Sequence, residues 1–259
     1  MNSVQRIEVN GQTPRVDDLP FPALLNYGHF TTMQIRNGAV RGLDLHLTRL
    51  DTSTRELFDT DLDRERVRDH IRHALADVQD ASVRTVVFRP DDDSDPSILV
   101  AVSPPADAPR TPQRLMSVQH QRGMAHIKHL GAFAQIHYRR QAQRAGFDEA
   151  LFTTESGNVS EGSITNIGFF DGPTLVWPDA PALPGITLLA INQALAAQGL
   201  TSERRTVHLD DVPTFDTVFL TNSQGISPVA QLNTHPCPLD PTLITKVTAL
   251  YESTPWTKI

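Results

Sequence analysis

Three features between residues 126 and 187 have side chains suited to cofactor chemistry. Lys128 follows a short apolar segment, and a partly buried lysine can form a Schiff base with an aldehyde. Glu161 could keep a pyridine nitrogen protonated, which makes the ring an electron sink. Gly185, Ile186 and Thr187 open a predicted helix, whose free N–H groups and dipole favour a phosphate. Together these residues predict a site for pyridoxal phosphate.

Several short segments, spread over most of the chain from about Ile7 to Val229, form an ordered set of motifs. They are Gly28–Thr32 with Asn37-Gly38, His46–Leu50, Ile127–Leu130, Gly146–Leu151, Glu161–Ile167, Leu183–Thr187 and Thr221–Val229. In this order they resemble the class IV pyridoxal-phosphate enzymes. That family contains the branched-chain and D-amino-acid aminotransferases and aminodeoxychorismate lyase.

The resemblance implies a fold, a domain division and a set of cofactor-binding residues. The fold would be α+β, with a smaller N-terminal α/β sandwich over residues 1–122 and a larger C-terminal pseudo-barrel domain over residues 123–259 that binds the cofactor. Lys128 would be the catalytic residue, and Arg49 would grip the phosphate, which a guanidinium can bind in a bidentate manner. The full set expected to bind pyridoxal 5'-phosphate is Arg49, Lys128, Glu161, Asn166, Ile186, Thr187, Asn222 and Ser223.

Two reactions follow from the same first steps. In both, the substrate amine would displace Lys128 from the cofactor aldehyde, and the freed lysine would move the Cα proton of the bound substrate. An aminotransferase would then pass the amino group from a small-molecule amino donor to a 2-keto acid, whereas a lyase would eliminate and release pyruvate and an aminobenzoate. We expect an aminotransferase that works through a Lys128 Schiff base. The lyase is the alternative, and a non-catalytic relative of the fold is the second alternative.

Several departures from the family pattern leave the identity of the substrate undetermined. His29 lies where members often carry Asp-Gly, Phe133 lies where branched-chain enzymes tend to have tyrosine, and Leu188 lies where arginine is usual. An acidic turn follows Arg89-Pro90, where related enzymes carry a glycine-rich loop with further basic residues. The candidates for the substrate pocket are Tyr27, His29, Thr31, Arg89 and Phe133.

Composition narrows the classes of partner. Lys and Arg total 23 against 30 Asp and Glu, for a formal charge of −7, which argues against nucleic-acid and membrane-surface binding. The start has no signal-peptide pattern, and no apolar run reaches the ~18–20 residues of a membrane span. The single Cys237 suits a reducing compartment, so we expect a cytoplasmic protein. We expect no metal, and a homodimer, since closed two-fold pairs are the commonest oligomers.

Periodicity and caps predict the elements that carry these residues. Strands are expected at 7–11, 28–36, 83–88, 98–102, 115–119, 150–154 and 159–170. Five helices are expected. The first carries the apolar stripe Leu43, Leu47, Leu50 and Leu57, and the second carries a stripe from Val67 to Val78 after an Asp63 cap. The third spans residues 133–145, the fourth begins at Gly185, and the fifth follows an Asp240 cap. A polar turn is expected from Arg89 to Pro96. Strands and helices in mixed order favour an α+β architecture.

Overall fold

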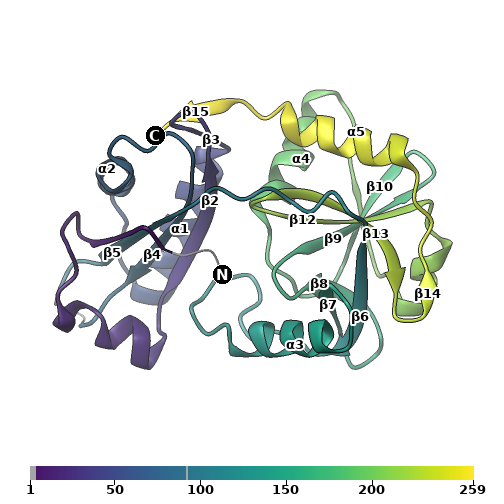
Figure 1. The fold of residues 1–259 in the computed structure, drawn as a ribbon, viewed down its shortest axis with the longest axis horizontal. Coiled ribbons are helices and arrows are strands. Elements are labelled where there is room, and N and C mark those ends of the chain that lie inside the picture. The colour runs from purple at the N-terminus through teal and green to yellow at the C-terminus, as the bar shows by residue number, and fades with distance from the viewer. Residues whose placement is uncertain (1–3, 92) are drawn as a thin grey trace. The chain divides into compact units, whose positions relative to one another are not determined.

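A computed structural model describes residues 4–91 and 93–259 (Figure 1). Residues 1–3, part of the start without a signal-peptide pattern, and Asp92 of the predicted polar turn lie outside the described residues. The chain forms two compact units. The first unit contains the chain up to Ala106, together with Ile127–Gly131 and Pro255–Ile259. The second contains Asp107–His126 and Ala132–Thr254. The bounds differ from a division after residue 122, because residues 107–122 belong to the second unit and two short segments return to pair with strands of the first unit.

An antiparallel sheet of four strands, in the order β1-β5-β4-β2, forms the centre of the first unit. Its strands are β1 (Arg6–Val9), β2 (His29–Ile35), β4 (Ala81–Phe88) and β5 (Ser97–Ser103). The first four predicted strands are therefore confirmed. The returning segment Pro255–Ile259 contains β15 (Trp256–Lys258), which pairs with β3 (Ala39–Arg41). Two short helical turns, Val16–Asp18 and the π-helix Phe21–Leu25, precede β2.

Helices α1 (Leu43–Phe58) and α2 (Arg64–Leu75) cover one face of this sheet. Their apolar stripes bury Leu47, Leu50, Val67 and Ile71 against the sheet, which is the core that the periodicity predicted. The prediction for Val78 was wrong. The second helix ends at Leu75, Ala76 adopts a positive φ of 47°, and Val78 is left exposed.

Asp63 caps α2 as predicted, because its side chain accepts hydrogen bonds from the backbone N–H groups of Glu65 and Arg66. We therefore expect Asp63→Ala to lower the free energy of unfolding by about 1 kcal/mol, the usual cost of losing an N-cap. Urea denaturation of this variant and of Asp77→Ala, an exposed carboxylate that follows the helix, provides the measurement. Equal midpoints for the two variants would contradict the capping role.

The second unit is built on a curled sheet of nine strands, in the order β11-β10-β9-β12-β13-β6-β7-β8 with β14 paired to β13 (Figure 1). The bounds are β6 (Gln113–Gln119), β7 (Glu149–Thr153), β8 (Val159–Gly162), β9 (Asn166–Asp171), β10 (Thr174–Pro178), β11 (Glu203–Arg205), β12 (Thr217–Asn222), β13 (Gly225–Leu232) and β14 (His235–Pro236). The pairs β6–β7, β6–β13 and β10–β11 are parallel. This mixture, with no regular alternation of strand and helix, confirms the α+β class.

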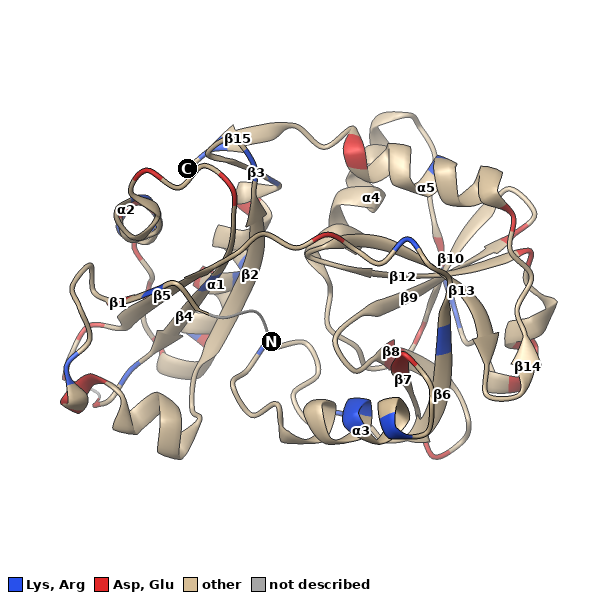
Figure 2. Ribbon diagram, in the orientation of Figure 1, with Lys and Arg blue, Asp and Glu red and all other residues tan. Residues whose placement is uncertain are grey.

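Three α-helices pack on this sheet, α3 (Phe133–Arg144), α4 (Ile186–Ala197) and α5 (Pro241–Glu252), and a 3₁₀ segment spans Leu209–Thr214. Helices α4 and α5 lie together over β12 and β13, whereas α3 lies against β6 and β7 (Figure 1). Asp240 caps α5 as predicted, because its side chain accepts from the N–H of Thr242. Basic and acidic residues are interspersed over both units (Figure 2).

The single strand predicted over residues 159–170 was wrong, because the chain turns between β8 and β9. The N–H of Gly162 donates to the carbonyl of Thr165 at 2.8 Å, and this tight turn redirects the chain. As a result β8 pairs with β7, whereas β9 pairs with β10 and β12. Glu161 and Asn166 are thereby placed on two strands of the sheet. Within the described residues no helix is long and apolar enough to cross a membrane.

Candidate active site

Lys128 lies on a segment that extends the edge of β2 in the first unit. The N–H of Phe30 donates to the carbonyl of Lys128 at 2.8 Å, and the N–H of Leu130 donates to the carbonyl of Gly28 at 2.9 Å. His29 and His129 form the intervening antiparallel bridge. The half-buried Lys128 side chain lies over the Phe30 ring, with Nζ 4.9 Å from the ring centroid. Backbone pairing over about 100 residues of sequence therefore holds the candidate Schiff-base lysine on the N-terminal sheet.

The positive charges of Arg49 and Lys128 both affect one buried group, the imidazole of His46. The Nδ1 atom of His46 lies 2.6 Å from Oγ1 of Thr31, and both residues are buried. Burial, together with the positive charges of Arg49 and Lys128, lowers the pKa of His46 to about 3. His46 is therefore neutral at neutral pH. The first residue of the His-x-x-Arg-Leu run thus lies within electrostatic range of two candidate site cations.

Two candidates for the substrate pocket lie close to the C-terminal end of α1. His29 has no exposed surface, and its Nε2 is 2.9 Å from Oγ1 of Thr54. Tyr27 is half exposed and donates its O–H to the carbonyl of Leu57 at 3.3 Å. Both rings contact Phe58. Because side chains alternate along a strand, His29 and Thr31 lie on the helix-covered face of β2 and Phe30 lies on the other.

The two buried imidazoles predict a loss of stability in acid. Burial lowers the pKa of His29 to about 3 from 6.5, as it does for His46, so between these values the unfolded chain binds more protons than the folded one. The free energy of unfolding should therefore fall as the pH drops from about 6.5 toward 3, by up to about 1.4 kcal/mol per pH unit for each imidazole. Urea denaturation between pH 7 and pH 4 measures this slope. We expect His29→Gln to flatten it by about one proton and the exposed His235→Gln to leave it unchanged. A slope that stays the same in His29→Gln would contradict the assignment.

Glu161 is the buried carboxylate of the second unit. Its Oε1 accepts from Nε of Arg122 at 3.0 Å, and its Oε2 accepts from the N–H of Leu183 at 3.0 Å. The side chains of Glu161 and Arg122 are only 7% and 8% exposed, so the ion pair is shielded from water. Arg122 also donates to the carbonyl of Ala125. Sequence reasoning missed Arg122, because nothing local in its segment distinguishes it from a surface arginine.

The N-terminus of α4 lies beside Glu161 in the same unit. Asn166 donates its Nδ2 to the carbonyl of Leu183 at 2.7 Å. Gly185, the N-cap residue, leaves no room for a side chain, because a Cβ there would meet Oδ1 of Asn166 at 2.0 Å. Among the residues that the structure describes, no side chain caps the helix, and the N–H groups of its first turn have no intrahelical partner. These N–H groups, which include those of Ile186 and Thr187, can therefore bind an anion.

Hydroxyl groups from the end of β12 complete this cluster. Thr187 donates its Oγ1 to the carbonyl of Asn222 at 2.6 Å, which joins α4 to β12. Thr221 lies opposite Asn166 in the β9–β12 pairing, so the two side chains share a face. The Oγ1 of Thr221 is buried and has no hydrogen-bond partner among residues 4–91 and 93–259. Ser223 follows, half-buried. A buried hydroxyl without a partner is costly, so this end of the sheet is suited to a polar ligand.

The structure thus brings the predicted residues together as two groups, one in each unit. Arg49, Lys128 and Thr31 lie around His46 in the first unit. In the second unit the gathered residues are Glu161, Asn166, Ile186, Thr187, Asn222 and Ser223. Phe133 belongs to the second unit, is 81% exposed, and stacks on His137.

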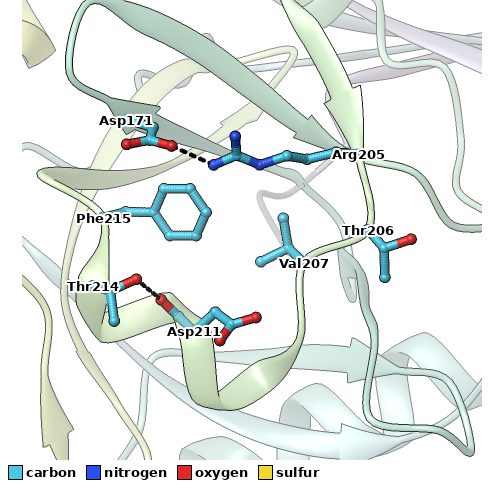
Figure 3. Close-up of a pocket in the computed structure, with 7 residues that line it drawn as sticks. All are labelled: Asp171, Arg205, Thr206, Val207, Asp211, Thr214 and Phe215. Atoms are coloured by element: carbon cyan, nitrogen blue, oxygen red, sulfur yellow. Dashed lines mark hydrogen bonds and ion pairs between the residues drawn. The ribbon is translucent and has the colours of Figure 1, made fainter.

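Two other chemically suggestive features lie outside these groups. A small polar pocket of the second unit is lined by Asp171, Arg205, Thr206, Val207, Asp211, Thr214 and Phe215 (Figure 3). Arg205 is bound there to Asp171 at 2.5 Å and to Glu203 at 3.2 Å, so its charge is already compensated. Burial raises the pKa of the Cys237 thiol to about 11, which keeps it protonated and unreactive.

Comparison with known proteins assigns the chain to a family. The family described as Amino-transferase class IV matches residues 28–232. A hypothetical aminotransferase from Mycobacterium tuberculosis in its apo form is 21% identical, with a TM-score of 0.84 and coverage of 97% of this chain and 98% of that chain. The mycobacterial protein has also been solved with PLP and with alpha-ketoglutarate and PMP. 4-Amino-4-deoxychorismate lyase from Pseudomonas aeruginosa is 26% identical, with a TM-score of 0.81 and coverage of 96% and 99%.

A relative with a similar sequence matches a smaller part of the chain than these solved structures do. Branched-chain-amino-acid aminotransferase-like protein 2 from Arabidopsis thaliana is 28% identical over 109 residues. These residues are 41% of this chain and 20% of that protein, so the chain matches only a fifth of the length of this relative.

Because the family match covers most of the chain, this protein belongs to the class IV aminotransferases, a family that depends on pyridoxal phosphate. The sequence resemblance is therefore confirmed. The family includes aminotransferases and a lyase, and both kinds of enzyme have the same fold.

The side chains in both units fit pyridoxal phosphate. In the second unit, a buried carboxylate lies near an uncapped helix N-terminus and the partnerless hydroxyl of Thr221, which suits a ligand with a ring nitrogen and a phosphate. In the first unit, Lys128 supplies an amine and Arg49 supplies a guanidinium. The chemistry of these donors is that required by an aldehyde and a phosphate.

Proposed function

We propose that this protein is a pyridoxal-phosphate-dependent aminotransferase that moves an amino group from an amino acid or amine to a 2-keto acid. The observation that carries the proposal is the buried Glu161, whose two oxygens are held by Arg122 and the N–H of Leu183 in a chain of this family. A carboxylate held in this way can accept one more hydrogen bond, from the protonated nitrogen of a pyridine ring.

Family membership supports the candidates for binding the phosphate. They are Arg49 in the first unit and, in the second unit, Thr187, Ser223 and the N–H of Ile186. Asn166 and Asn222 would support this group, since each is tied to the start of α4. Bound pyridoxal phosphate supplies an aldehyde that reacts with an amine and a ring that accepts electrons from the Cα–H bond.

Lys128 would move the proton of the reaction. Once released, its Nζ would accept the Cα proton of the substrate and return it at a different carbon. Backbone pairing to β2 limits the motion of the Lys128 main chain, and the Phe30 ring favours a cation in contact with its face. Arg122 would hold Glu161 in one orientation, because Nε of Arg122 and the N–H of Leu183 bind different oxygens.

Elimination to pyruvate is the alternative activity. The observation that favours it is the similarity to the lyase of Pseudomonas aeruginosa, at 26% identity over nearly the whole of both chains. Lyase and aminotransferase would share the proton transfer at Lys128 and differ in the later steps. We also propose a homodimer, which light scattering would test, and a monomer that binds the cofactor at full strength would contradict it.

Spectroscopy and product analysis test the proposed function. We expect purified protein to take up pyridoxal phosphate and gain an absorption band in the near-visible region. Incubation with 2-oxoglutarate and a panel of amino acids should yield glutamate, whereas 4-amino-4-deoxychorismate should yield pyruvate only if the lyase alternative holds. Protein that takes up no cofactor would favour a non-catalytic relative of the fold.

A further inference from the structure

A second buried carboxylate, that of Glu149, lies at the start of β7 in the second unit. Its side chain is only 5% exposed. Its Oε1 accepts from the N–H of Ala150 at 2.9 Å and from the hydroxyl of Ser163, and its Oε2 lies 3.3 Å from Nε of Arg139 on α3. One carboxylate thus joins β7, α3 and the turn between β8 and β9.

Ser163 fastens the turn that carries two of the candidate cofactor residues. Glu161 lies just before it, near the end of β8, and Asn166 lies just after it, at the start of β9. Ser163 is buried, and its N–H donates to the carbonyl of Ala150 at 2.9 Å. The backbone and the side chain of Ser163 are therefore both bonded to the start of β7. A shift of Ser163 would move Glu161 and Asn166 together.

The turn between β8 and β9 is tightly closed. The N–H of Gly162 donates to the carbonyl of Thr165 at 2.8 Å, and a Cβ on Gly162 would meet Oγ1 of Thr165 at 2.1 Å. Densely packed segments transmit a displacement instead of absorbing it. The contact of Ser163 with Glu149 is therefore coupled to the position of the Glu161 carboxylate.

The partners of Glu149 suit its charged form. Burial raises the pKa of its carboxyl group, whereas the Ser163 hydroxyl, the charge of Arg139 and the N–H of Ala150 act in the opposite direction. The N–H and guanidinium groups can only donate and the hydroxyl is able to donate, so a deprotonated carboxylate can bind all three. A buried ion pair adds little net stability, because desolvation offsets the attraction. Stability alone therefore gives no reason for a charge at this position.

Arg139 connects this carboxylate to the helix that follows the Lys128 segment. Helix α3 begins five residues after Lys128 and has basic but no acidic side chains (Figure 2). The pair of Arg139 with Glu149 holds one face of α3 against β7. The same carboxylate therefore restrains two segments that adjoin Lys128 and Glu161 in the sequence.

From these contacts we infer that Glu149 is a positioning residue, which acts through Ser163 to hold Glu161 in the orientation that a pyridine nitrogen requires. The inference rests on the proposed function and adds to it a residue that acts through another side chain. Misplacement of a catalytic group by about 1 Å can cost ~100-fold in rate. Glu149 thereby sets how firmly Glu161 keeps the ring nitrogen protonated.

Two variants that remove the link between Glu149 and Ser163 test this role. Ser163→Ala deletes the hydroxyl, and Glu149→Leu replaces the carboxylate by an apolar group of similar volume, a change that buried ion pairs often tolerate. With pyridoxal phosphate bound, the pH midpoint of the near-visible band should rise in both by about 0.4–1 pH unit, the effect of weakening one hydrogen bond. A ring nitrogen that is held less firmly as a cation withdraws fewer electrons, so the nitrogen joined to the aldehyde carbon becomes more basic.

Turnover provides a second readout. In the assay with 2-oxoglutarate and amino acids, kcat should fall about 10- to 100-fold in Ser163→Ala and in Glu149→Leu. Affinity for pyridoxal phosphate should change much less, because the groups that would bind the phosphate are intact. The combined variant should match the more impaired single variant, since both changes remove the same link.

Two further variants serve as controls. Glu149→Gln keeps a carboxamide oxygen that can accept from Ser163, so it should retain most of the wild-type band midpoint and kcat. Asp148→Asn changes the neighbouring carboxylate, which is half-buried and accepts from the N–H of Arg114 at 2.8 Å. It should behave like the wild type.

An unchanged band midpoint and kcat in Ser163→Ala would overturn the positioning role, and so would additive losses in the combined variant. Lower stability in urea without a shift of the band would also overturn it, because Glu149 would then serve the fold alone. Ser163→Ala removes a single hydroxyl and keeps the test decisive if Glu149→Leu does not fold. No uptake of pyridoxal phosphate by the wild type refutes the proposed function, whereas uptake with wild-type behaviour in the variants refutes only the role of Glu149.

Discussion

Lys128→Ala is expected to reduce turnover by at least ~10²–10⁴-fold, the contribution typical of a single proton-transfer group. Affinity for pyridoxal phosphate should fall much less, because the phosphate would still be bound by Arg49 and by the start of α4. The near-visible absorption band should be lost or shifted. Stopped-flow spectroscopy with an amino acid substrate and a cofactor titration would measure the two effects separately.

The second lysine along the chain provides a matched control. Lys246 is exposed on α5, where it donates to the carbonyl of Pro173, so Lys246→Ala should keep both the absorption band and turnover. Borohydride reduction of the loaded wild type should attach the cofactor to a peptide containing residue 128, which mass spectrometry would detect. Covalent attachment elsewhere, or wild-type turnover in Lys128→Ala, would remove Lys128 from the chemistry.

Arg49→Ala is expected to weaken binding of pyridoxal phosphate by roughly 2–5 kcal/mol, the range for truncating one partner of a buried charge pair. This cost corresponds to an affinity loss of roughly 30- to 5,000-fold. The absorption band should return at high cofactor concentration, because Lys128 is unchanged. Fluorescence titration with pyridoxal phosphate gives the dissociation constants directly.

Thermal stability offers a second readout for Arg49. A cofactor concentration one hundred times the dissociation constant should stabilise the wild type by ~2.7 kcal/mol, and the same concentration should stabilise Arg49→Ala much less. Arg55→Ala on the same helix is the control. Arg55 is exposed and pairs with Asp61 at 2.7 Å, and such surface pairs contribute little. Near-wild-type affinity in Arg49→Ala would remove Arg49 from the site and weaken the match of His46–Leu50 to the family motif.

The sequence by itself determined the features that depend on neighbours along the chain. Asp63 and Asp240 predicted helix starts because a cap bonds to N–H groups two or three residues away. The β-branched residues of Val83–Phe88 predicted a strand, because such side chains favour extended backbone. The order of the motifs predicted the family and the identity of Lys128 and Glu161, because the cofactor requires particular chemical groups.

Only the tertiary structure decided which distant segments meet. Lys128 extends β2 because its carbonyl accepts the N–H of Phe30, and no local pattern encodes a pairing over that separation. Arg122 binds Glu161 across 39 residues, and this contact distinguishes a buried ion pair from two surface charges.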